Sequence, residues 1–349
     1  MAHNKIIWVD AIRVFAIVLV VLQHVVTPLL YSIYKIHIND WWLSNIYHSI
    51  SDVCVPLLLM ISGYLLIDFD APIKLFIHKR ILKVLIPLIA WTLIYLLWNH
   101  FYNHNVDLSL IGIVKTIIKP AHYHLWFLYT IMGLYLLMPV LNVFIKNSSN
   151  SIQYYLIILW FTSVSISPLF QKILNTSPNK EDLSIFSGYL GYLLIGYILG
   201  NKKFNRKYLP FLVVTSILLI AFSSIATYYL MLMDNGIINK YFHTYLSPNV
   251  IILSSLIFII IKVLFENQQE LDGYKYFILN KLSKATFGIY LIHVIVLNLL
   301  KNGDMGFTFT SFTLTPIIGI PILTMFIFFM SFTLIYIIQK IKILRKCVP

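Results

Sequence analysis

Repeated apolar runs of about 20 residues are the feature that most restricts how this chain can fold. A helix rises 1.5 Å per residue, so each run is long enough to cross the roughly 30 Å hydrocarbon core of a bilayer. Strands of a membrane barrel would alternate apolar and polar residues over about ten positions instead. Only 11% of the 349 residues are charged and 59% are hydrophobic, whereas a soluble domain carries about 25% charged residues. The sequence therefore predicts an all-α, polytopic integral membrane protein.

The chain contains ten predicted spans. They cover residues 6–31, 45–67, 80–98, 125–145, 152–171, 184–200, 209–231, 249–266, 285–301 and 312–339. The connections are too short for a soluble domain, so we expect residues 1–349 to form a single membrane domain. No small-residue cleavage site follows the first span, so we expect this span to be retained.

The basic residues indicate an orientation. The formal net charge is +13, and with the N-terminus inside, eighteen of the Lys and Arg residues fall on the inner side and seven on the outer side. Loops on the cytoplasmic side of a membrane are enriched in Lys and Arg. We therefore expect both termini in the cytoplasm, lipid as a partner, and no nucleic-acid binding.

The first span carries three ionisable residues on one side. Asp10, Arg13 and His24 fall within roughly 40° of one another on a helix that turns about 100° per residue. An Arg or Asp near the centre of a span costs at least ~2.5 kcal/mol, so such groups usually face a cavity or a partner. We interpret Arg13 and His24 as catalytic residues and Asp10 as the group that orients Arg13 from position i−3. The alternative is an Arg13 side chain that reaches the interface and a His24 that donates to a backbone carbonyl.

A small-residue segment lies at the depth of Arg13. Ser62, Gly63 and Tyr64 fall near the inner end of the second span. Glycine allows close backbone approach, so these residues are candidates for binding a cofactor. The alternative is helix packing, with Tyr64 at the membrane interface.

Basic residues begin the next predicted helix on the cytoplasmic side. Arg80 and Lys83 share one face, and Lys79 precedes them. They are candidates for binding the phosphates of a cofactor. Their alternative role is to set topology and contact anionic lipid.

Histidines in two later spans complete the candidate site. His124 and Trp126 are expected at the outer boundary, near the depth of His24, and His293 roughly 12 Å from the inner face, with Tyr290 one turn before it. Alternatively, Trp126 is an aromatic residue of the membrane interface and His124 is solvated. For His293, the alternative is a hydrogen bond between helices. The histidine-rich outer loop 99–124 matches no metal-ligand spacing, and Cys54 and Cys347 form no paired motif, so no metal is expected.

The order of these motifs resembles the membrane acyltransferase-3 family. The motifs are Asp10-x-x-Arg13 with His24, Pro56-Leu-Leu-Leu-Met-Ile-Ser62-Gly63-Tyr64-Leu, Lys79-Arg80, His124-Leu-Trp126-Phe-Leu, and Gly288-Ile-Tyr290-Leu-Ile-His293. The Met-Ile-Ser-Gly-Tyr and Tyr-His-Leu-Trp-Phe segments look like the branch that includes the enterobacterial common antigen O-acetyltransferase.

The resemblance implies a stand-alone O-acetyltransferase of the bacterial inner membrane. It would move an acetyl group, or a slightly larger acyl group, from cytoplasmic acetyl-CoA to a hydroxyl of a cell-surface or lipid-linked glycan. Family members depend on the residues that correspond to Arg13 and His24. Many carry an Arg-x-x-Arg pair where this chain has Arg80 and Lys83. Because Lys lacks the bidentate guanidinium, Arg80 is the stronger candidate for the donor site.

Two questions stay open at the sequence level. His24 could be the general base on the acceptor hydroxyl or a transient acyl carrier. A transporter or flippase for a lipid-linked saccharide is the main alternative function, because intramembrane ionisable groups also mark transport paths. No internal repeat supports that alternative, and a sensor or scaffold lacks a soluble domain that would pass on a signal.

Overall fold

Helices make up the regular structure, as expected for a backbone that must satisfy its own hydrogen bonds in lipid. The computed structural model describes residues 6–103, 109, 112, 119–169, 188–234, 236–266 and 273–349, and the regular elements within them are helical. This confirms the predicted all-α membrane fold. Nine helical segments of the described chain are long and apolar enough to cross a membrane. A shorter apolar helix, Leu190–Asn201, overlaps the predicted span 184–200, whose first residues lie outside the described part.

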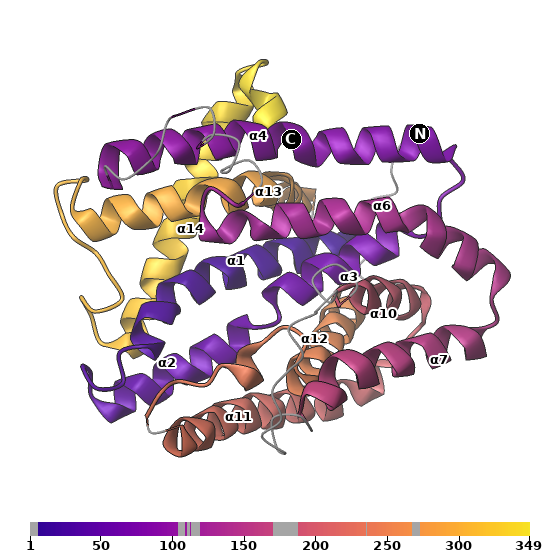
Figure 1. Cartoon of the computed structure of the whole chain (residues 1–349), viewed down its shortest axis with the longest axis horizontal. Coiled ribbons are helices and arrows are strands. Elements are labelled where there is room, and N and C mark those ends of the chain that lie inside the picture. The colour runs from indigo at the N-terminus through magenta and orange to yellow at the C-terminus, as the bar shows by residue number, and fades with distance from the viewer. Residues whose placement is uncertain are drawn as a thin grey trace.

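The elements follow in chain order, with the labels of Figure 1. They are α1 (Ile7–Leu30), α2 (Ile38–Ser51), α3 (Cys54–Leu66), α4 (Ile73–Asn103), η1 (Tyr123–Leu125), α6 (Trp126–Asn147), α7 (Asn150–Phe161), the π-helical turn η2 (Thr162–Ile166), α10 (Leu190–Asn201), η3 (Arg206–Tyr208), α11 (Leu209–Met233), η4 (Tyr241–His243), α12 (Pro248–Phe265), α13 (Gly273–Asn302), α14 (Pro316–Lys340) and η5 (Leu344–Cys347).

The second predicted span is longer than expected and is broken. It starts at Ile38 instead of residue 45, and α2 and α3 are separated at Asp52 and Val53. Pro56 explains the break, because it has no N–H to donate to the carbonyl of Asp52 and its ring would clash with that carbonyl in a continuous helix. The break brings Asp52 into the interior, where it is fully buried.

Helix α1 lies in the middle of the bundle, and α2, α3, α12, α13 and α14 contact it. Its connection to α2 and the connection from α13 to α14 lie at one end of the bundle in Figure 1. The connections from α3 to α4 and from α6 to α7 lie at the opposite end. The Ile7 end and the Leu30 end of α1 therefore define the two ends of the bundle used below.

Helices α3 and α10 approach closely through glycine. A Cβ atom added at Gly63 would lie 2.0 Å from the backbone oxygen of Leu193, and one added at Gly196 would lie 2.0 Å from the backbone oxygen of Met60. Small residues at such an interface let two helix backbones approach closely. This pairing anchors α3, and with it Ser62 and Tyr64, against the rest of the bundle.

Candidate active site

Three histidine rings meet near the Leu30 end of α1. His24 from α1 stacks on His293 from α13 with ring centroids 5.1 Å apart, and His293 meets the edge of the His124 ring at 5.4 Å. His124 comes from η1, just before α6. The predicted grouping of His24 with His124 is therefore present, with His293 between them. We call His24, His124 and His293 the histidine cluster.

Backbone contacts orient the members of the cluster. The Nδ1–H of His293 points at the carbonyl of Tyr290, with a nitrogen–oxygen distance of 2.7 Å. The hydroxyl of Tyr290 donates to the carbonyl of His124. A proton on Nδ1 leaves the Nε2 atom of a neutral His293 with a free lone pair. Tyr290 thus links His124 and His293 through its hydroxyl and its backbone carbonyl. Its predicted contact with substrate stays a prediction.

Two nitrogen atoms of the cluster are buried without a hydrogen-bond partner among the described residues. They are Nε2 of His293 and Nε2 of His124. Buried polar groups in proteins are nearly always paired, so an unpaired set calls for an explanation. A group that enters the cluster and can hydrogen-bond to imidazole supplies one. A hydroxyl would satisfy these atoms.

Three further residues around the cluster were not predicted as site residues. The Tyr123 ring lies 5.1 Å from that of His24, and Nδ1 of His122 lies 3.2 Å from Nδ1 of His124. Tyr95, on α4, lies 4.9 Å from the rings of both His122 and His124. His122 and Tyr123 belong to the motif that carries His124 and could have been included. Tyr95 has no local sequence signal, because only packing brings α4 to this place.

The level expected for His293 relative to His24 was wrong. The sequence placed His293 nearer the inner face than His24, because the ninth span was expected to begin at residue 285. Helix α13 begins at Gly273 and extends to Asn302, so His293 lies in its last third and at the level of His24. Trp126 is also displaced from the cluster, because its indole packs on Tyr245 at 5.9 Å and Tyr189 at 5.7 Å. Its predicted role in substrate binding stays a prediction.

At the opposite end of α1, the predicted pair of Arg13 and Asp10 is confirmed. The Arg13 Nη1 atom lies 3.3 Å from Oδ1 of Asp10, and Oγ of Ser283 donates to the same oxygen at 2.6 Å. The side chain of Arg13 is 37% exposed to solvent, and that of Asp10 is 15% exposed. Asp10 is thus fixed from two helices and holds Arg13, while the guanidinium stays accessible.

Helix α4 adds basic residues to this end. Lys83 lies within electrostatic range of both Arg80 and Arg13. Tyr135, on α6, is within range of the two arginines as well. Arg80 also lies over the ring of Phe76, 5.9 Å from its centroid. The arrangement gathers Arg13, Arg80 and Lys83, while Lys79 is exposed one residue before Arg80.

The small-residue segment of α3 has packing partners of its own. Ser62 Oγ donates to the carbonyl of Leu58 at 3.0 Å, and Tyr64 lies 4.7 Å from the ring of Trp8. Gly63 lies against the backbone of Leu193. These packing contacts account for the residue types at the three positions without a cofactor. Their predicted contact with a cofactor stays a prediction.

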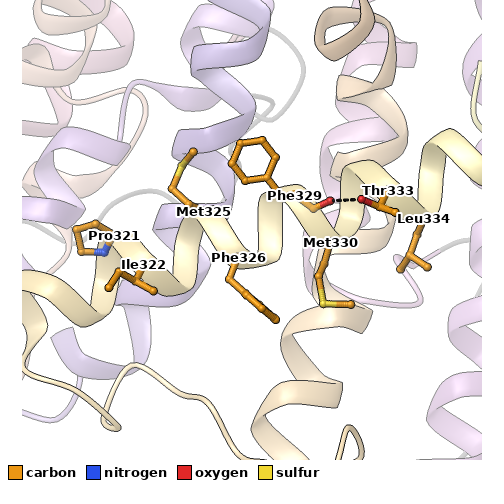
Figure 2. Close-up of a pocket in the computed structure, with 8 residues that line it drawn as sticks. All are labelled: Pro321, Ile322, Met325, Phe326, Phe329, Met330, Thr333 and Leu334. Carbon is orange, nitrogen blue, oxygen red and sulfur yellow. Dashed lines mark hydrogen bonds between the residues drawn. The ribbon is translucent and has the colours of Figure 1, made fainter. Parts of the chain in front are cut away.

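A hollow of about 640 Å³ lies elsewhere, along α14 (Figure 2). Figure 2 shows that its lining comes from one helix and is almost entirely apolar; the residues are Pro321, Ile322, Met325, Phe326, Phe329, Met330, Thr333 and Leu334. Its single hydroxyl, that of Thr333, donates to the carbonyl of Phe329 at 2.9 Å. Such a surface suits lipid and offers no group for acyl transfer, so the histidine cluster remains the candidate active site.

Comparison with protein families gives a match over nearly the whole chain. Residues 6–339 match the model of the acyltransferase domain of the acyltransferase-3 family. The chain belongs to the acyltransferase-3 family. Comparison with curated proteins and with solved structures found no match. The protein is therefore a membrane acyltransferase, and the matched region contains the histidine cluster and the basic residues around Arg13.

Proposed function

We propose that this acyltransferase moves an acetyl group from acetyl-CoA, bound at the Arg13 end, to a hydroxyl of a cell-surface or lipid-linked glycan bound at the histidine cluster. The observation that carries the proposal is the unpaired, buried Nε2 atom of His293, stacked on His24 at the end of α1 away from the basic residues. An acceptor hydroxyl is a group that such a nitrogen atom can bind and deprotonate.

The donor end has the charge that CoA requires. CoA carries several phosphates, and guanidinium groups form strong, charge-assisted hydrogen bonds with phosphate. Arg80 and Lys83 supply positive charge near Arg13. Arg13 is paired with Asp10, so we assign Arg80 to the phosphates and Arg13 to the entry of the pantetheine arm.

At the acceptor end, His24 accepts the proton of the hydroxyl as the oxygen attacks the acetyl carbonyl carbon. The carbon–sulfur bond breaks, and the CoA thiolate leaves and takes up a proton. In the alternative sequence, the His24 imidazole attacks first and carries the acetyl group before the hydroxyl attacks it. General-base catalysis by a positioned histidine contributes about 10²–10⁴-fold to a rate.

The two ends are separated by a distance that the reaction has to cover. His24 and Arg13 are eleven positions apart on α1, or about 16 Å along the axis. In both sequences His24 acts directly at the acetyl carbon, so the thioester must reach the histidine cluster. The transfer therefore requires either a pantetheine arm that extends along α1 or a further group that relays the acetyl group to His24.

The test compares His24→Ala with His37→Asn. The first removes the imidazole of the cluster, and we expect acetyl transfer to fall by about 100-fold or more. The second is the matched control, because His37 is an exposed residue that caps α2, and Asn is also a good cap. CoA release by purified protein with labelled acetyl-CoA and mass spectrometry of surface glycans from expressing cells give the two readouts.

Both variants must elute as the parental protein does in detergent. Equal acetylation by a folded His24→Ala protein would overturn the catalytic assignment. Surface glycans without any acetyl difference between expressing and non-expressing cells would overturn the acceptor class. A transport function would instead give saccharide movement in the absence of a thioester donor, and the family match does not favour it.

We also propose a bacterial inner membrane location and a place in the branch that includes the enterobacterial common antigen O-acetyltransferase. The first rests on the apolar helices and the family match. The second rests on the two sequence segments that resemble that branch.

A further inference from the structure

A second cluster of ionisable residues lies close to the active site and has no part in the proposed reaction. His48 and Asp52 are one turn apart at the end of α2, and His243 comes from η4. Their exposed fractions are 5%, 0% and 5%. One ligand atom from each lies within 4.8 Å of the others. A fully buried carboxylate needs compensation by positive charge.

His243 is oriented by a residue on its far side. Its Nε2 atom lies 3.0 Å from Oδ1 of Asn45. The orientation of Asn45 is fixed, because its Nδ2 donates to the carbonyl of Ser224 at 2.9 Å. The Oδ1 atom of Asn45 can only accept, so Nε2 of His243 carries a proton. A metal-binding histidine typically has this arrangement, with its second nitrogen donating to an oxygen behind it.

The other nitrogen of His243 then faces an acceptor. Its Nδ1 atom lies 2.7 Å from Oδ2 of Asp52. With the proton of a neutral imidazole on Nε2, a lone pair points at a carboxylate oxygen. That contact is favourable only when a cation lies between the two atoms. The cation is a second proton on His243 or a metal ion.

His48 favours the metal ion. Its Nδ1 atom lies 3.0 Å from Oδ1 of Asp52 but is poorly aligned for a hydrogen bond with that oxygen. It is buried and points into the cluster. A second proton on His243 leaves this nitrogen with only that poorly aligned contact, whereas a metal ion binds it together with Nδ1 of His243 and the carboxylate.

We propose that His48, Asp52 and His243 bind a Zn²⁺ ion, with water in the fourth position. Two imidazoles and a carboxylate are common ligands of Zn²⁺, at about 2.0–2.2 Å. Tetrahedral ligand atoms at that distance lie roughly 3.3 Å apart. The Nδ1 atom of His243 and Oδ2 of Asp52 would separate by about half an ångström on binding. This departs from the expectation of no metal, which considered only the loop 99–124 and the cysteines.

The ion would join elements that are far apart in sequence. It links η4, in the connection between α11 and α12, to the break between α2 and α3. Asp52 also accepts from Nε2 of Gln23 at 3.3 Å, and Gln23 is next to His24. Oε1 of Gln23 accepts from the Tyr245 hydroxyl at 2.7 Å. The site therefore holds α1 in register beside the active site.

The experiment measures metal content in the full-length protein, purified in detergent through a tag without histidine. After incubation with Zn²⁺ and removal of free metal, we expect elemental mass spectrometry to find about one zinc ion per chain. His243→Gln and Asp52→Asn should each lower this at least about tenfold. His37→Asn is the control and should keep the ion.

Co²⁺ provides a readout on the unaltered protein, which avoids dependence on the folding of variants. Bound at this site, it should give the visible absorption of four-coordinate Co²⁺, and Zn²⁺ should abolish that absorption. Parental protein that binds neither ion would overturn the proposal and leave a protonated His243 paired with Asp52. A bound ion that both variants retain would overturn it as well.

Discussion

At the scale of single residues, the Arg13 end and the histidine cluster have different chemistry. Arg13 is held by Asp10 and lies near Arg80 and Lys83, so this end collects positive charge. The histidine cluster has a buried, unpaired nitrogen that can accept a proton, the Nε2 atom of His293. The first suits an anionic, phosphate-bearing donor, and the second suits a neutral hydroxyl.

Arg80 and Lys83 provide a test of the donor end. We expect Arg80→Ala to raise the KM for acetyl-CoA about tenfold or more, because a charge-assisted hydrogen bond contributes about 1.5–3 kcal/mol. Lys83→Ala should raise it less, since an ammonium group cannot bind phosphate in bidentate fashion. The measurement is steady-state CoA release at varied acetyl-CoA.

Lys342→Ala is the matched control for loss of a basic residue, because Lys342 is exposed near the C-terminus. It should leave KM unchanged. A fall in kcat without a change in KM in Arg80→Ala would contradict a role in donor binding and would point to a role in the chemical step.

At the scale of elements, the contact between α3 and α10 shows how packing competes with function as an explanation. Gly63 lies in a segment that resembles a motif of the family, yet a side chain there would overlap the backbone of Leu193. We expect Gly63→Ala and Gly196→Ala to destabilise the protein by about 1–3 kcal/mol each, as in other overpacked interiors. Both should lower the apparent midpoint of thermal unfolding in detergent.

Gly273→Ala is the control, because an added Cβ at the start of α13 meets nothing within 4 Å. It should leave the midpoint unchanged or raise it, since Ala favours helix over Gly by up to about 1 kcal/mol. If Gly63→Ala unfolded like the parental protein and raised only the KM for acetyl-CoA, Gly63 would belong to the donor site.

The sequence allowed the membrane helices and the pair of Arg13 and Asp10 to be predicted, because both depend on neighbours within one helix. The start of α13 could not be predicted from hydropathy. Its first turns contain Lys275, Lys281 and Lys284, which lower the apolar character of that segment. The level of His293 relative to His24 was predicted wrongly for this reason.

Contacts between distant segments were the other part that the sequence did not reveal. His243 meets Asp52 from 191 positions away. Tyr95 reaches His124 through the packing of α4 on the helices around it. Periodicity within one helix identifies the face that a residue lies on, but it does not identify the helix that covers this face.

At the scale of the whole molecule, the orientation in the membrane determines which compartment supplies the donor. The basic residues around Arg13 and the histidine cluster lie at opposite ends of α1. Acetyl-CoA is a cytoplasmic metabolite, so the proposed reaction requires the Ile7 end of α1 to face the cytoplasm. The distribution of Lys and Arg predicts the same orientation.

Labelling with a membrane-impermeant maleimide tests this orientation in spheroplasts of a bacterium that expresses the protein. In a Cys347→Ser background, Lys35→Cys should react in intact spheroplasts, because Lys35 is exposed between α1 and α2. Ile343→Cys should react only after permeabilisation, since Ile343 is 80% exposed beyond the end of α14 and is expected in the cytoplasm. Cys54 is buried and should stay unlabelled in both. The reverse pattern would put the Arg13 end outside, where acetyl-CoA is absent, and would rule out the proposed direction of acetyl transfer even if the histidine cluster is catalytic.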